Sequence, residues 1–213
     1  MAMADPRDTT DTVNVVLAEP IKPKKKYHII SLDIESSGRD YTRHALLSIG
    51  LVDQKGENFY IALQHRSLEV EPQAMRVNQL PVVRIDLDGV SPKKADQAML
   101  DWLNARMKPD EQAVAMGLNI GSFDMPFVRR WLPRSAARFS RRTMDLNALI
   151  FERCLVSGEE FDDLKHKLAK NGHARAWTET NGPQDQALGP HHALFDAYSN
   201  WGMFLELRRR NTQ

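Results

Sequence analysis

The sequence predicts an α/β domain built on one mixed β-sheet with helices on both sides. Three apolar segments near the start of the patterned region are joined by short connections, which is typical of an antiparallel meander. Helical and strand patterns then alternate along the chain, as they do where parallel strands are covered by helices. The chain has 213 residues, which is enough to bury a sizeable core.

The expected sheet has three antiparallel strands followed by two shorter ones. The fourth is a short apolar run between turn signals, which is typical of a buried parallel strand. The strands are expected at about residues 27–34, 45–53, 58–63, 113–118 and 141–144.

The helices are expected from apolar positions at helical spacing. Ser91 and Pro92 are suited to begin the first long helix as its N-cap and first residue. Helices are expected at about residues 92–107, 123–132, 145–156, 161–170 and 190–209, with a short one at 72–80. Gly and Pro interrupt residues 171–190, which predicts a long loop there.

Composition limits the class of protein. One cysteine, Cys154, excludes a disulfide framework and a cysteine-based zinc site, and it suits a reducing compartment. The sequence has neither a signal peptide nor an apolar run of the roughly 20 residues that a membrane span needs. We therefore expect a cytoplasmic protein with no membrane partner. The net charge of +1 means that any basic surface must be local.

The first 26 residues differ from the rest of the chain. They are rich in Asp, Thr and Pro, show no period, and end in the basic run Lys22-Pro-Lys-Lys-Lys26. We expect a disordered polar and basic tail at residues 1–26, followed by one domain at residues 27–213.

Two carboxylates follow the apolar part of the first strand. Residues i and i+2 of a strand point to the same face, so Asp33 and Glu35 should project side by side while Ile34 faces the core. Two carboxylates this close remain ionised only with a cation between them. The pair is either half of a divalent metal site or a harmless end to the strand.

Three further acids lie where expected elements begin. Asp124 and Asp145 fall in the first turns of helices, where an acid also complements the helix dipole or acts as an N-cap. Asp196 lies off the apolar stripe of the last helix, a position that also suits a solvated acid. His191 precedes Asp196 by five residues, so the two share a face only if His191 lies in the loop before the helix. A histidine there is either a general base or a surface residue.

Together these residues resemble the motifs of a known superfamily. Asp33-x-Glu35, Asn119 with Phe123-Asp124, and His191-x4-Asp196 have the order and spacing of the three motifs of the DEDDh 3′–5′ exonucleases. That superfamily includes the polymerase III proofreading subunit, RNase T and oligoribonuclease, and the resemblance covers about residues 27–208. It implies a ribonuclease-H-like fold with a mixed five-stranded sheet.

The resemblance also implies a set of roles. Asp33, Glu35, Asp124 and Asp196 are expected to bind two divalent cations, Mg²⁺ or Mn²⁺, with His191 as the base and Asp145 in support. Two such ions stabilise the charge that develops during phosphodiester hydrolysis. The expected substrate is the 3′ end of a single-stranded DNA or RNA, and the expected products are nucleoside 5′-monophosphates.

The terminal nucleotide would be held around these acids. Ser36, Ser37 and Gly38 are expected to offer backbone N–H groups, and Asn119 to fix the loop or touch the strand. Six arginines in a short stretch are candidates for phosphate contacts. They are Arg129, Arg130, Arg134, Arg138, Arg141 and Arg142.

Three positions depart from the superfamily pattern. Ser36 replaces the usual Thr, Leu118 stands where His is common, and Ser48 stands where the proofreading type has Glu. None removes an expected ligand or base. Two other functions remain open: a catalytically silent relative that binds nucleic acid, and an oligoribonuclease-type enzyme for very short oligonucleotides. By resemblance to the RNase T and oligoribonuclease branches, the chain is also expected to form a homodimer.

Overall fold

The computed structural model describes residues 27–74, 89–179 and 189–210, and within these ranges it describes side chains except at residues 173–179 and 210. Five strands of this part of the chain form one sheet in the order β3-β2-β1-β4-β5. The strands are β1 (His28–Ser36), β2 (Leu46–Asp53), β3 (Asn58–Ala62), β4 (Ala113–Gly117) and β5 (Met144–Asp145). The expected tail at residues 1–26 lies outside the described residues.

The sheet is mixed, as the sequence predicts. β1, β2 and β3 are antiparallel neighbours, whereas β4 pairs in parallel with both β1 and β5. In the β1–β2 register Asp33 faces Gly50 and Glu35 faces Ser48. β1 is therefore central, and its two carboxylates lie within the sheet near the end of the strand.

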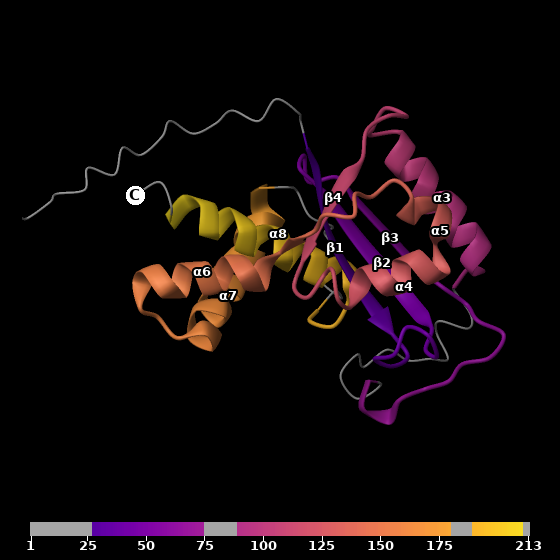
Figure 1. Ribbon diagram of the computed structural model, residues 1–213, viewed down its shortest axis with the longest axis horizontal. Helices are drawn as coiled ribbons and strands as arrows, with labels where there is room; N and C mark the ends of the chain where they lie inside the picture. The colour runs from indigo at the N-terminus through magenta and orange to yellow at the C-terminus, as the bar shows by residue number, and fades with distance from the viewer. Residues whose placement is uncertain (1–26, 75–88, 180–188, 211–213) are drawn as a thin grey trace, which may run out of the picture.

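Helices cover both faces of the sheet (Figure 1). They are α3 (Pro92–Asn104), α4 (Asp124–Trp131), α5 (Pro133–Ala136), α6 (Leu146–Ser157), α7 (Phe161–Glu179) and α8 (Ala193–Arg210). One core includes Ile34 of β1 and Met99 of α3, and the other includes Leu146 of α6 and Tyr198 of α8. The predicted two-sided cover is confirmed.

α8 is fixed across the sheet by polar contacts as well as by packing. The Ser31 hydroxyl on β1 donates to the Ala197 carbonyl at 2.7 Å. The Asn58 amide on β3 donates to the Tyr198 hydroxyl at 2.9 Å, and that hydroxyl donates to the Gly56 carbonyl at 3.3 Å. These bonds fix the helix that carries Asp196 relative to the strand that carries Asp33.

The predicted loop at residues 171–190 is wrong for its first half, because α7 continues to Glu179. Gly172 faces Gly202 of α8, and a Cβ on Gly202 would lie 1.9 Å from the Gly172 carbonyl oxygen. The glycine that suggests a helix end is thus used for a close crossing of two helices. Packing against α8 outweighs the low helix propensity of Gly. Residues 180–188 of the expected loop lie outside the described residues.

Smaller differences occur at other boundaries. The helix expected at 92–107 ends at Asn104, although Met107 remains buried in the same core, which is why its spacing suggested helix. α5 begins at Pro133, where the sequence predicted only an end, because Pro is also well tolerated as the first residue of a helix. β5 is Met144–Asp145 instead of 141–144, and two residues are too few to give a pattern. Of the short helix expected at 72–80, residues 72–74 are helical and the rest lies outside the described residues.

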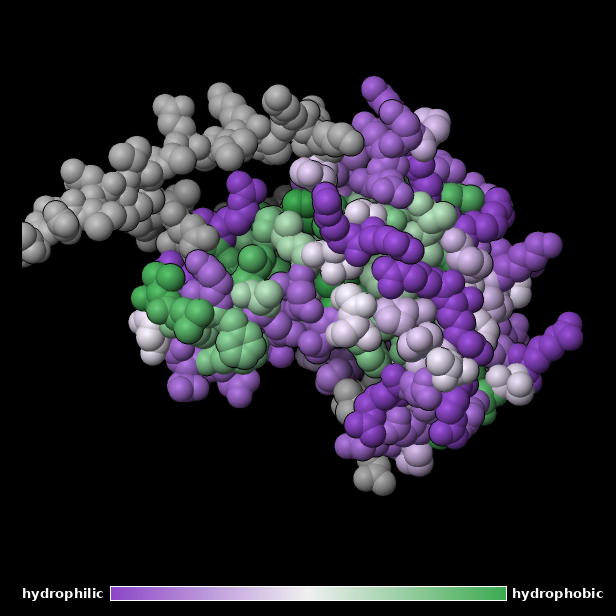
Figure 2. All heavy atoms as spheres, in the orientation of Figure 1, coloured by the Kyte–Doolittle hydropathy of each residue, from purple (hydrophilic) through white to green (hydrophobic). Residues whose placement is uncertain are grey.

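Apolar side chains gather on the surface at the α6 end of the molecule (Figure 2). Phe151, Leu155 and Val156 of α6 are exposed there, and Phe151 stacks on Phe161 at the start of α7. Cys154 is a partly buried residue of α6. Among the described residues, no helix is both long and apolar enough to cross a membrane.

Candidate active site

Asp33 and Glu35 project from β1 on the sheet face that α8 covers. Ile34 between them is buried in the core on the opposite face, as strand alternation requires. Ser31, two residues before Asp33, bonds to α8 on the same face as the carboxylates. The predicted side-by-side placement is confirmed.

α8 brings a third acid to this pair. One carboxylate oxygen each of Asp33, Glu35 and Asp196 lies within 4.8 Å of the others. Segments about 160 positions apart in the sequence therefore meet in one cluster. Three carboxylates at this spacing could hold a metal ion, and an all-oxygen set suits a hard divalent cation.

Asp124 lies beside these three acids, at the start of α4. It is 3% exposed. Its charge raises the pKa of both Asp33 and Glu35, which places it close to both. The backbone N–H groups of Asp124 itself and of Ile34 lower the pKa of the Asp124 carboxyl, so β1 contacts the first turn of α4. The structure thus gathers all four acids that the sequence nominated.

Burial raises the pKa of each of these carboxyls, and at Asp33 and Glu35 the charges of the neighbouring acids raise it further. Burial contributes most to the raised pKa of Asp33, followed by the charges of Asp124, Asp196 and Glu35. Burial, then the charges of Asp196 and Asp124, raises the pKa of Glu35 to about 9. Burial raises the pKa of Asp124 to about 8 and that of Asp196 to about 6. Without a cation, much of the cluster would be protonated near neutral pH.

His191 lies in the turn just before α8. Its backbone N–H donates to Asp196 Oδ2 at 2.9 Å, and the residue is exposed. Its φ is 65°, in the left-handed region that β-carbon sterics disfavour. Since α8 begins only at Ala193, His191 and Asp196 converge despite a separation that would place them on different faces of a continuous helix.

Asp145 supports the neighbouring loop instead of joining the three-acid cluster. Its carboxylate caps α6 by accepting from the Asn147 N–H at 2.9 Å, and it also accepts from the Asn119 N–H at 3.2 Å. Asn119 has φ of 55°, and its Oδ1 accepts from the Asn147 amide at 2.8 Å. The charge of Asp145 also raises the pKa of Asp124.

A cavity of about 380 Å³ adjoins Glu35. Ser36, Gly38 and Asn119 line it, together with Phe123, which also packs on Phe127. Ser37 is not among its lining residues, because its groups hold the loop together. The Ser37 N–H donates to the Ala45 carbonyl and its hydroxyl to the Glu69 carbonyl. The Ser37 N–H is therefore already used and is not free for a nucleotide.

A second cavity, of about 510 Å³, also adjoins the acids. Asp33 and Asp196 line it with Leu118, Met203 and the cation Lys170. The three acids thus border two cavities, Glu35 the first and Asp33 and Asp196 the second.

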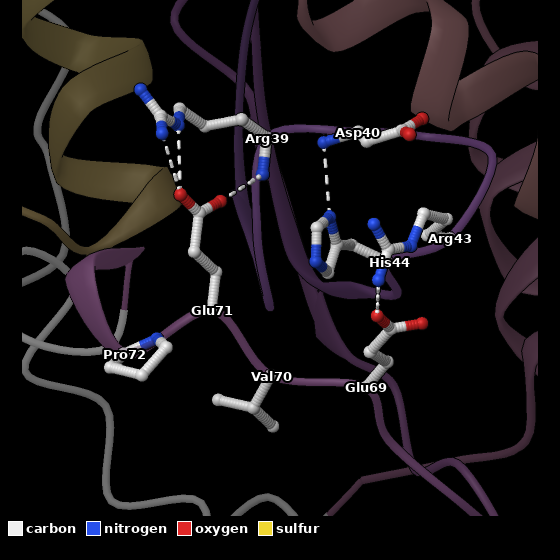
Figure 3. Close-up of a pocket in the computed structure, with 8 residues that line it drawn as sticks. All are labelled: Arg39, Asp40, Arg43, His44, Glu69, Val70, Glu71 and Pro72. Atoms are coloured by element: carbon white, nitrogen blue, oxygen red, sulfur yellow. Dashed lines mark hydrogen bonds and ion pairs between the residues drawn. The ribbon is translucent and has the colours of Figure 1, made fainter.

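The loop between β1 and β2 carries two arginines that the sequence did not single out, around a third cavity of about 640 Å³ (Figure 3). Arg39 donates to both carboxylate oxygens of Glu71, through Nη2 at 2.7 Å and through its backbone N–H at 3.0 Å. Arg43 pairs with Glu69. Arg39 also lines the cavity beside Glu35, so the loop joins the two spaces.

Asn200 is another residue that the sequence analysis missed. It lies four residues after Asp196 on α8, which places both on one helix face. It is 2% exposed, and its side-chain amide lowers the pKa of Asp33, which places the two side chains close together. The i+4 spacing was the available signal, but an Asn within a helix is too common to be selected on that basis.

The run of arginines does not form one surface. Arg138 donates to the carbonyls of Lys108 and Pro109, and Arg134 donates to Gln97. These two guanidinium groups therefore bind to α3 and to the segment that follows it. Arg129, Arg130, Arg141 and Arg142 are exposed.

The central strand carries two carboxylates, and one acid from α4 and one from α8 lie beside them on a sheet of the expected order. This is the class of site and fold that the resemblance to the DEDDh 3′–5′ exonucleases implies. The comparisons with known proteins agree with this class. The chain is 33% identical to the 3′–5′ DNA exonuclease Cap18 of Escherichia coli over 101 residues, which cover 46% of this chain and 54% of that protein. No protein-family model matches the chain.

Solved structures share the fold. The zinc-bound complex of E. coli exonuclease I with single-stranded DNA superposes with a TM-score of 0.63 at 14% identity, over 89% of this chain and 42% of that one. Exonuclease I of Methylocaldum szegediense gives a TM-score of 0.59 at 13% identity, over 88% and 41%. Sequence similarity thus makes the chain a homologue of the 3′–5′ DNA exonuclease Cap18, and the exonuclease I structures share its fold. The chain spans about half the length of each of these proteins.

Proposed function

We propose that the protein is a metal-dependent 3′–5′ exonuclease that acts on single-stranded DNA and releases nucleoside 5′-monophosphates. The observation that carries the proposal is the meeting of Asp33, Glu35 and Asp196 within 4.8 Å, with Asp124 and His191 beside them. We propose DNA and not RNA as the substrate because Cap18, which resembles this chain in sequence, is a DNA exonuclease.

The four carboxylates fit a divalent cation site. The raised pKa values of Asp33 and Glu35 reflect burial first and then repulsion from the neighbouring acids, and a bound cation would relieve that repulsion. Mg²⁺ and Mn²⁺ both suit oxygen ligands. Two such ions, when bound, would activate water and stabilise the negative charge that develops at the phosphate and at the leaving 3′-oxygen.

The remaining residues supply proton transfer and positioning. His191 accepts the proton of the attacking water, and its exposed position lets that proton pass to solvent. Its backbone bond to Asp196 keeps this base next to the carboxylates. Asp145 holds Asn119, and through it the loop that lines the cavity.

The two cavities bind successive nucleotides of the substrate. The cavity of about 380 Å³ is of the size of small-ligand pockets and receives the terminal nucleoside, with Phe123 as an apolar wall. The cavity of about 510 Å³ receives the adjacent nucleotide, with Lys170 near its phosphate. This division favours a substrate longer than a mononucleotide ester.

A digest of matched single-stranded DNA and RNA oligonucleotides, labelled at the 5′ end, tests the proposal. With Mg²⁺ or Mn²⁺ we expect the DNA to shorten stepwise from its 3′ end, and chromatography to show 5′-monophosphates. EDTA should stop the reaction. If the protein binds DNA but shortens neither oligonucleotide, it is a silent relative and the proposal is wrong. If only very short oligonucleotides are degraded, the oligoribonuclease-type alternative is correct.

A further inference from the structure

An aromatic pair lies at the start of α8, outside the residues that the exonuclease motifs nominate. Tyr60 on β3 stacks on His192, with ring centroids 4.4 Å apart and an interplanar angle of 28°. His192 directly follows His191, and it also accepts the Leu194 N–H at its Nδ1. The ring of His192 is therefore engaged in holding the turn, which distinguishes it from its neighbour.

The sheet register links this pair to the carboxylates. Tyr60 faces Gly50 on β2, and Gly50 faces Asp33 on β1, so the three residues form one row across the sheet. Residues opposite each other in neighbouring strands share a face. The row thus presents a phenol at one end, a carboxylate at the other, and no side chain in the middle.

The first turn of α8 occupies this gap. A Cβ on Gly50 would lie 2.4 Å from the Ala193 carbonyl oxygen and 2.5 Å from the Leu194 Cα. Tyr60 is also close enough to Glu35 for that charge to raise the pKa of its phenol, after the larger effect of burial. The start of α8 is therefore held between the Tyr60 ring and the acids.

This arrangement accounts for the conformation of His191. A non-glycine residue at φ of 65° carries a cost in free energy that the surroundings must offset. Three contacts restrain the turn. They are the stack of Tyr60 on His192, the close approach of the start of α8 to Gly50, and the hydrogen bond from the His191 N–H to Asp196.

We propose that Tyr60 and His192 are positioning residues, whose stack fixes the turn that presents His191 to the carboxylate cluster. The inference rests on the proposed exonuclease function. Tyr60 acts through the backbone of residues 191–193 and does not itself touch the reacting atoms. Losing the stack should loosen the base while leaving the cations and the substrate cavities in place.

The test compares Tyr60→Leu with Tyr60→Phe, which keeps the ring. We expect Tyr60→Leu to lower kcat by about ten- to a hundredfold with little change in KM, since small displacements of a catalytic group have effects of that size. Tyr60→Phe should recover most of kcat. Tyr27→Leu is the matched control, because Tyr27 is a 49% exposed tyrosine just before β1.

A double-mutant cycle separates positioning from general destabilisation. In a His191→Ala background, Tyr60→Leu should lower kcat by no more than about twofold, because the base it positions is gone. Equal losses in both backgrounds would overturn the proposal.

Hydrogen exchange gives a readout that does not depend on activity. The amide of His191 should exchange faster in Tyr60→Leu than in the wild type and in Tyr27→Leu. An unchanged exchange rate would overturn the inference. A wild type without nuclease activity would instead reject the proposed function, while the exchange rate would still decide whether Tyr60 holds the turn.

Discussion

At the scale of single residues, the main feature of the site is a group of buried carboxylates that lie close together. Four acids lie together with pKa values raised by burial and, at Asp33 and Glu35, also by the charges of the other acids. Such a cluster destabilises the fold unless protons or cations neutralise it. The sequence identified all four acids because their spacing matches known motifs. It missed Tyr60, because only the sheet register aligns this residue with Asp33. It also missed Asn200, which lies on the same face of α8 as Asp196.

The stability of the metal-free protein should therefore fall as pH rises. Carboxyls titrate near 4 in unfolded chains, at about the usual values for Asp and Glu, but Asp196, Asp124 and Glu35 titrate at about 6, 8 and 9 in the fold. A group with a raised pKa favours the fold at low pH and loses that contribution as pH rises through the folded-state value.

Thermal melts in EDTA across this range provide the measurement. Tm should fall from about pH 5 to about pH 8, and added Mn²⁺ should raise Tm more at the higher pH, because the cation binds ionised carboxylates. Glu35→Gln should flatten the pH dependence. A Tm in EDTA that rises with pH across this interval would contradict the description of the cluster.

His191 is expected to matter for rate and not for cation binding. His191→Ala should lower kcat by about 10²–10⁴, the range for a general base, while the affinity for Mn²⁺ measured by calorimetry stays near the wild-type value. His166→Ala, an exposed histidine on α7, is the control. Unchanged kcat in His191→Ala would assign proton transfer to another group.

At the scale of elements, α8 determines how the site is assembled. It packs on β1 and β2, supplies Asp196 and Asn200, and crosses α7 at Gly202 and Gly172. The sequence predicted this helix from its apolar stripe. It could not predict that α7 continues past Gly172, because a glycine that ends a helix and one that permits a close crossing look the same in sequence.

The helix crossing gives a prediction about stability. Gly202→Ala should lower the free energy of unfolding by about 1–3 kcal/mol, the usual cost of overpacking, because its Cβ would overlap the Gly172 backbone. Gly189→Ala is the control, since a Cβ there meets nothing within 4 Å. Urea denaturation measures both variants. Equal midpoints would show that the crossing can relax.

At the scale of the whole molecule, the fold brings the acids to the walls of two cavities. The sequence predicted the mixed sheet and its two-sided cover from strand and helix patterns. The cavities could not be predicted, because their walls combine residues from β1, α7 and α8 with the β1–β2 loop and the loop between β4 and α4. The homodimer expected by resemblance stays a prediction that sedimentation equilibrium can check.

Lys170 tests whether the second cavity binds nucleic acid. Lys170→Ala should raise KM for single-stranded DNA and reduce the slope of log affinity against log salt by about one, as the loss of one phosphate contact requires. Lys55→Ala, in the turn after β2, should leave the slope unchanged. If Lys170→Ala has the wild-type slope, the substrate does not pass through this cavity.

The rate of Asp33→Asn shows whether phosphodiester hydrolysis occurs at the carboxylate cluster. The substitution keeps the shape of the side chain and removes one charged ligand. Release of 5′-monophosphates from single-stranded DNA with Mn²⁺ should fall at least about 10³-fold, because the cations contribute several kcal/mol to the transition state. Asp110→Asn, at an exposed acid before β4, should keep the wild-type rate. A near-wild-type rate in Asp33→Asn would show that hydrolysis does not depend on this cluster.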